Sequence, residues 1–205
     1  NAGSVVVQSG TNLHLAGGGI STGNFTSQGV LSFSGSHTLS GNISSTGTIN
    51  FTGLGTQILA GGTYASAGTF VDGAATLSIV SGVTWVNLGA VSFGINPGAV
   101  LNLQSGLSIT IPSLTFQGSG ATIQGSDSLT VTGTVTKQGT GTATISVPLV
   151  NDSSGLVNVQ AGTLGLSGAV TNNGTSRVGS NAALNLTGTL SNLSGGALTG
   201  GIYEV

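Results

Sequence analysis

Charge is almost missing from this chain. Four acidic and two basic residues occur in 205, whereas an ordinary soluble domain carries about a quarter charged residues. A nucleic-acid partner needs several lysines or arginines to neutralise its phosphates, and an anionic membrane surface makes the same demand. We therefore expect neither of these partners. The charged residues are Asp72, Asp127, Asp152, Glu204, Lys137 and Arg177.

Cysteine and methionine are absent, and only 3 prolines occur. Without cysteine the chain has no disulfides, no thiolate metal ligands and no thiol nucleophile. A membrane-spanning helix needs roughly 20 mostly apolar residues, and the most apolar stretch, 77–103, is broken by serine, asparagine, glycine and proline. We expect no membrane insertion. Because the chain starts at Asn1 and ends in a strand-like stretch, we also expect it to be a fragment of a longer repeat protein.

What the chain does contain is glycine, 38 residues of it, and a recurring unit that ends in glycine. The unit reads apolar, polar, apolar, polar, and glycine follows one or two places later. Strict alternation is the period of a strand with one buried face, and glycine gives the backbone freedom of a tight turn. Apolar residues at helical spacing never persist beyond one turn. Copies of the unit lie at 31–35, 49–53, 101–106, 129–133, 157–162 and 184–188.

The distance between copies predicts how the strands are arranged. Leu13, Leu31 and Ile49 follow one another at equal steps, and several later steps are longer. A repeat of roughly 20 residues with two or three short strands has the size of one coil of a parallel β-solenoid. We predict one all-β domain over residues 1–205, a parallel β-helix of about ten coils. An antiparallel β-sandwich is the alternative, although only Asn-Gly at 173–174 and Asp-Gly at 72–73 offer two-residue hairpin turns.

The unit Leu-Ser-Gly-x-Val-x-Asn-Asn-Gly-Thr at 166–175, with the related stretch 193–203, resembles repeats of bacterial surface adhesins. Filamentous-haemagglutinin-like proteins and autotransporter passenger domains are similar. The resemblance covers most of the chain and rests on a style of repeat. It implies a right-handed β-helix, export to the cell surface, and a role as stalk, adhesin or scaffold. The implied partners are glycans, host or cell-surface molecules, or further copies forming a fibre. No functional residue carries over.

Some parallel β-helices act on polysaccharides, and this alternative depends on the acidic residues. Hydrolysis of a glycosidic bond needs two carboxylates about 5 to 10 Å apart. Asp72, Asp127, Asp152 and Glu204 are each isolated in the sequence, and the two basic residues are far apart. We therefore expect a non-catalytic protein without cofactor or metal, and keep a polysaccharide-active enzyme as the alternative.

The two histidines are interpreted as surface residues. His14 lies between two leucines, so alternation points it outward, and His37 falls in a predicted turn. Two histidines alone do not complete a zinc site.

Threonine and the rare aromatic residues offer the remaining candidate sites. Threonines at 130–136 and 140–144 share a strand face and resemble ice-binding ladders, but the equivalent positions elsewhere mix serine, asparagine and glutamine. Ice binding is therefore kept only as an alternative. Trp85, the single tryptophan, and Tyr64 are the candidate glycan contacts if exposed. Alternation does not fix their side, and filling the core is the commoner role of such residues.

Overall fold

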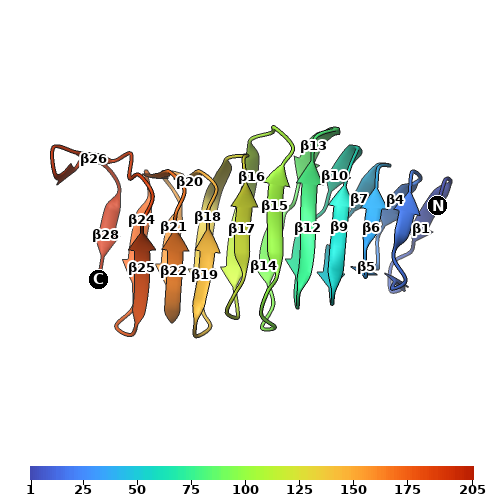
Figure 1. The fold of residues 1–205 in the computed structure, drawn as a ribbon, viewed down its shortest axis with the longest axis horizontal. Helices are drawn as coiled ribbons and strands as arrows, with labels where there is room; N and C mark the ends of the chain where they lie inside the picture. The colour runs from blue at the N-terminus through green and yellow to red at the C-terminus, as the bar shows by residue number, and fades with distance from the viewer.

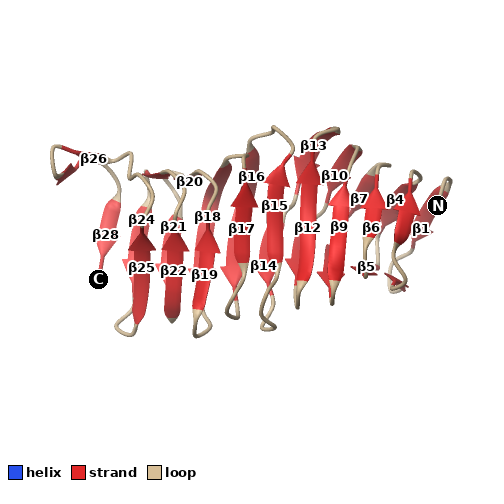
Figure 2. Cartoon of the chain, viewed as in Figure 1, coloured by secondary structure: helices blue, strands red, loops and turns tan.

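The computed structural model describes all 205 residues, and strands are its only regular elements (Figure 2). The strands stand side by side along one axis, with the N-terminus at one end and the C-terminus near the other (Figure 1). The predicted parallel β-solenoid is confirmed, with about nine turns. The antiparallel sandwich is wrong, because every pairing in the three large sheets is parallel. The structure contains no helix that could serve as a membrane span.

Three sheets, here called A, B and C, form the walls of the solenoid. Sheet A contains β1 (Ser4–Val7), β4 (Asn24–Ser27), β7 (Ile43–Ser45), β10 (Gly62–Ala65) and β13 (Val83–Asn87). Sheet C contains β3 (Gly19–Ser21), β6 (His37–Leu39), β9 (Gly55–Leu59), β12 (Ala75–Val80), β15 (Val100–Gln104), β17 (Thr122–Gly125), β19 (Thr142–Ile145), β22 (Gly162–Leu166) and β25 (Ala182–Leu186).

Sheet B is the longest wall. Its main path contains β2 (Asn12–Leu15), β5 (Val30–Ser34), β8 (Thr48–Thr52), β11 (Gly68–Val71), β14 (Ala90–Phe93), β16 (Ile109–Phe116), β18 (Leu129–Lys137), β21 (Leu156–Val159), β24 (Thr175–Val178) and β28 (Ile202–Glu204). Two short strands, β20 (Leu149–Asn151) and β23 (Val170–Asn172), branch from β18. A separate antiparallel pair, β26 (Leu193–Ser194) and β27 (Ala197–Leu198), lies near the C-terminus.

The pairing changes where the chain passes from β13 to β16. Each earlier coil places one short strand in each wall, but β16 has 8 residues and β18 has 9. The first halves of these long strands pair with each other, at Ile109↔Leu129, and their second halves pair again beyond a register shift next to Pro112. Because proline has no N–H to donate, the shift falls where a regular ladder is weakest. Strand β13 pairs only with β10.

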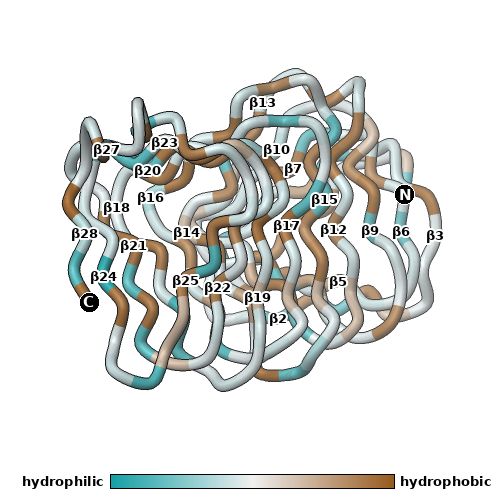
Figure 3. Tube along the Cα trace, turned by 60° about the vertical axis from the view of Figure 1, so that its left-hand side comes forward, coloured by the Kyte–Doolittle hydropathy of each residue, from teal (hydrophilic) through white to brown (hydrophobic).

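Side chains from the three walls fill a single core of 39 buried apolar residues. The tube in Figure 3 alternates apolar and polar residues along the strands, as expected for walls with one buried face. Equivalent residues of successive coils stack directly. The Phe33 and Phe51 rings lie 5.6 Å apart and nearly parallel, and Phe93 and Phe116 lie 5.0 Å apart. Each such fully buried side chain contributes about 1.5–3 kcal/mol, and the buried core extends along the axis from Val7 to Val170.

Candidate functional site

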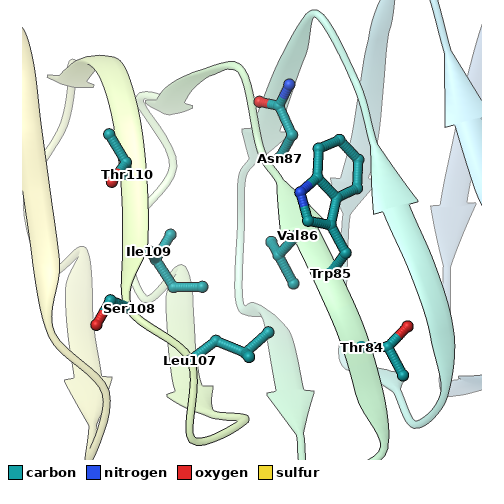
Figure 4. Close-up of a pocket in the computed structure, with 8 residues that line it drawn as sticks. All are labelled: Thr84, Trp85, Val86, Asn87, Leu107, Ser108, Ile109 and Thr110. Carbon is teal, nitrogen blue, oxygen red and sulfur yellow. The ribbon is translucent and has the colours of Figure 1, made fainter.

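An open groove of about 350 Å³ lies between β13 and the start of β16. Figure 4 shows Val86, Leu107 and Ile109 between the two strands, Trp85 and Asn87 on the β13 side, and Ser108 and Thr110 on the β16 side. The groove exists because no ladder joins these two strands. Its lining residues are Thr84, Trp85, Val86, Asn87, Leu107, Ser108, Ile109 and Thr110, none of which is ionisable.

A β-bulge places Trp85 on the outside of the wall. Gly62 pairs with Val83 but Thr63 pairs with Trp85, so Thr84 is an extra residue in β13. Regular alternation would put the side chains of Val83 and Trp85 on the same, inner face of the wall. The bulge reverses the alternation, so that Val83 points inward and Trp85 is 52% exposed. Bulges commonly re-aim a side chain in this way. The expectation that Trp85 fills the core is therefore wrong, while its contact with a glycan stays a prediction.

Tyr64 behaves in the opposite way, one coil earlier in the same sheet. It is 1% exposed, and its hydroxyl lies 3.1 Å from Thr69 Oγ1 inside the core. Thr69 in turn donates to the Leu88 carbonyl over 2.7 Å. Burial raises the pKa of the Tyr64 phenol to about 12, against a smaller opposing effect of its hydrogen bonds. The prediction that Tyr64 contacts a glycan is wrong, because its ring cannot reach the surface.

A row of neutral polar side chains runs across the outer face of sheet A toward Trp85. The Asn42 backbone N–H donates to Asn24 Oδ1 over 2.9 Å. Thr63 donates to Asn42 Oδ1 from its backbone N–H, at 3.0 Å, and from its hydroxyl, at 3.1 Å. Thr63 is the direct pairing partner of Trp85. These bonds fix the side chains from coil to coil, so the surface beside the tryptophan is ordered and uncharged.

Asp127 holds the segment that forms the far side of the groove. Its carboxylate accepts from the Ser105 backbone N–H at 2.7 Å, from the Ser105 hydroxyl at 2.6 Å and from the Gly106 N–H at 2.9 Å. Such charge-assisted bonds are roughly twice as strong as neutral ones. Close by, Gly125 has a φ of +127°, and a Cβ added there would collide with the Leu103 carbonyl. Leu107, which follows the segment held by Asp127, is partly buried and packs against the core.

The other acidic residues serve separate turns or ion pairs. Asp72 accepts from the Asn96 backbone at 3.0 Å and from its amide at 2.7 Å. Asp152 accepts from the following Ser153 N–H at 2.8 Å. Glu204 pairs with Arg177 at 2.6 Å on the surface, where such a pair contributes little. No cluster of three or more His, Asp or Glu residues that could hold a metal is present.

The two histidines and the lysine differ in placement. His14 is exposed as predicted, with Nε2 2.8 Å from Ser34 Oγ. His37 was expected on the surface but is 7% exposed in β6, where its Nε2 lies 3.0 Å from the Leu15 carbonyl. The surface interpretation is wrong for His37, because its turn is a strand whose side chain points inward. Lys137 is fully buried and donates to the Gly139 carbonyl, and burial lowers its pKa.

Sheet C carries a threonine row that the sequence did not reveal. Thr56, Thr76, Val100, Thr122 and Thr144 occupy one outward register position in five successive coils. Neighbouring strands lie about 4.8 Å apart, so these side chains form a regular ladder. The steps between the members are unequal along the chain, and this irregularity hides the row in the sequence.

The groove could not be predicted from the sequence either, because it depends on how whole coils pair. Leu107 and Ile109 read as ordinary members of an apolar pattern, and only the pairing of whole coils shows that they face an interruption. The one available signal is the long step from Leu101 to Leu129 between two copies of the repeat unit. Chemically, the groove offers hydroxyl, amide, aromatic and aliphatic groups, and none of its lining residues is an acid or a base. Comparison with models of known families, with curated proteins and with solved structures gives no match.

Proposed function

We propose that this chain is a non-catalytic structural and adhesive segment of an exported bacterial surface or fibre protein. The observation that carries the proposal is an outer surface with almost no charge, on which rows of hydroxyl and amide side chains lie among scattered exposed apolar residues. The few charges are tied to turns or to each other, as Asp127 and Arg177 illustrate. A wall of this kind is stiff because each coil is bonded to its neighbours. It also presents hydroxyl and amide groups in fixed rows, which suits contact with glycans.

The resemblance of the repeats at 166–175 to bacterial adhesins adds support for the same proposal. The polysaccharide-active alternative has less support, because Asp72, Asp127 and Asp152 each bond to the backbone of a different turn. Hydrolysis by two carboxylates requires that they face one another across a bond.

A display experiment tests the adhesive function. The chain is fused to an anchor on the surface of a bacterium without adhesins of its own, and retention is measured on glycan-coated surfaces under flow. We expect retention on some glycans above that of the anchor alone. A chain that is folded, as shown by its far-ultraviolet circular dichroism, and yet gives no retention on any surface contradicts adhesion and leaves a spacer role.

A second candidate function, ice binding, is supported by the threonine row of sheet C. Four threonines and Val100, at a rung spacing of about 4.8 Å, form an uncharged strip in which one rung lacks a hydroxyl. Thermal hysteresis is the measurement: we expect Thr122→Tyr, within the row, to abolish it, while Thr136→Tyr on sheet B has no effect. A wild-type solution without thermal hysteresis eliminates this candidate.

A further inference from the structure

We infer that the groove between β13 and β16 binds a neutral oligosaccharide, with Trp85 as its stacking platform. This inference rests on the proposed adhesive function and assigns to it a site and a class of partner. Three independent features of the groove support the inference, namely the exposed ring, the composition of its walls and the lack of charge.

A β-bulge in β13 exposes the indole ring of Trp85. An ordinary continuation of the alternation in β13 buries the side chain two residues after Val83, and the extra residue Thr84 prevents this. The fold thereby keeps its single tryptophan 52% exposed, although burying an aromatic of this size is strongly favourable. An exposed indole face binds the C–H face of a sugar ring, because both surfaces are flat and apolar.

The walls of the groove match the two sides of a sugar. Val86 and Leu107, both partly buried, provide an apolar strip between the strands above the buried Ile109. Polar groups lie on both sides, Thr84 and Asn87 on one and Ser108 and Thr110 on the other. The volume of about 350 Å³ lies at the lower end of the range for small-ligand sites. Backbone groups on the facing edges of β13 and β16 are outside any shared ladder, so they add donors and acceptors for sugar hydroxyls.

The absence of charge selects the kind of saccharide. None of the eight lining residues is ionisable. A uronic acid or sulfated sugar brings an anion that needs a cation or several donors to replace its water. Lys137, which is buried in the core, and Arg177, which pairs with Glu204, are not among the lining residues. A neutral sugar loses no such hydration, and its chain can continue over Thr63 and Asn42.

An extended peptide fits the groove less well. A strand inserted between two others needs about 9.6 Å between its neighbours, twice the usual spacing of 4.8 Å. Cα atoms of β13 and β16 approach within 8 Å of each other. The gap is therefore too narrow there for a strand that pairs with both edges, and a ligand must lie along the groove and not within the sheet.

Fluorescence of Trp85 tests the inference directly, because it is the only tryptophan. The folded chain is titrated with cellotetraose, chitotetraose, maltotetraose and xylotetraose, and in parallel with tetragalacturonate and an alternating Thr-Val heptapeptide. We expect a saturable emission shift with at least one neutral tetrasaccharide, and about tenfold or greater weakening for the acidic one. No shift with any neutral saccharide, tighter binding of tetragalacturonate, or binding of the peptide instead overturns the inference.

Variants separate stacking from other effects. In calorimetry with the best neutral saccharide, Trp85→Ala is expected to weaken binding about tenfold or more, and Trp85→Phe by less. Leu54→Ala is the matched control, because Leu54 is an exposed apolar residue, 78% exposed, outside the groove. Unchanged affinity in Trp85→Ala overturns the inference. If cells displaying Trp85→Ala adhere like wild type, the adhesive function stands and the assignment of the saccharide site to the groove fails. If the wild-type chain binds a saccharide in calorimetry but cells displaying it do not adhere, the groove site stands and the adhesive function fails.

Discussion

Sheets C and A are made from the same kinds of residues, yet only one of them is interrupted. Sheet C runs through nine strands without a gap, whereas sheet A ends at β13 after five. Beyond that point the first halves of the long strands β16 and β18, which belong to sheet B, pair with each other and not with β13. The difference shows that composition does not create a candidate site in this protein. The bulge in β13 and the lengthened strands β16 and β18 do so, by opening a regular wall at a single place.

The largest expected effect is on stability, and it compares two leucines of the same coil, one in the closed wall and one beside the groove. Leu101 belongs to β15 of the closed sheet C and its side chain is fully buried, while Leu107 is only partly buried beside the groove. We expect Leu101→Ala to lower the free energy of unfolding by about 2–5 kcal/mol, and Leu107→Ala by less than half of that. Urea unfolding followed by circular dichroism measures both. Equal losses would mean that the core is closed equally well under both walls.

A smaller effect is expected from the carboxylate that orders the groove. Asp127→Asn replaces an acceptor oxygen by an amide facing the N–H groups of Ser105 and Gly106. Leaving such buried donors without a partner costs about 1–3 kcal/mol. Asp152→Asn is the matched control, since the Asp152 carboxylate accepts only from the neighbouring Ser153 N–H, and we expect its unfolding midpoint to stay near that of wild type. Identical unfolding midpoints for the two variants would show that the Asp127 carboxylate does not stabilise the segment at Ser105 and Gly106.

The smallest expected effect concerns the closed wall of sheet B. Lys137 stands in register with Phe116 in an otherwise apolar row, and burial lowers its pKa below 10.5. The unfolded chain therefore binds the proton more tightly, and wild-type stability rises with pH between the lowered pKa and 10.5. Lys137→Met should stabilise the protein by less than about 1 kcal/mol at pH 7.

The pH dependence of that gain is the decisive readout. The advantage of Lys137→Met over wild type is expected to shrink as the pH approaches 10.5, where the unfolded chain also loses its proton. Urea unfolding midpoints of both proteins at pH 7 and pH 10 measure it. A gain that is independent of pH would show that packing, and not the buried ammonium group, is responsible.

The sequence was sufficient for the architecture and insufficient for the site. Alternation correctly placed Leu31, Phe33, Ile49 and Phe51 inside, where all four are fully buried, because these two strands pair residue for residue without a register shift. The strand period says which residues share a face, but a single inserted residue reverses the face for all that follow.

Trp85 and His37 show what sequence reasoning missed. The bulge at Thr84 is defined only against Gly62 and Thr63 on the neighbouring strand, so nothing local in the sequence reveals it. The stretch around His37 has the composition of a turn, yet its pairing with Gly19 and Gln57 makes it a strand. Both errors come from pairing between coils, which is a tertiary property.

Direct stacking of equivalent residues also has an evolutionary consequence. Leu31 and Ile49 occupy one register position, as do Phe33 and Phe51, so a crossover between gene copies at such positions joins compatible ends. Loss of residues 31–48 would shorten the molecule by one rung, about 4.8 Å, and duplication would lengthen it by the same amount. The length of the protein can thus change in fixed increments while the tryptophan groove is inherited intact.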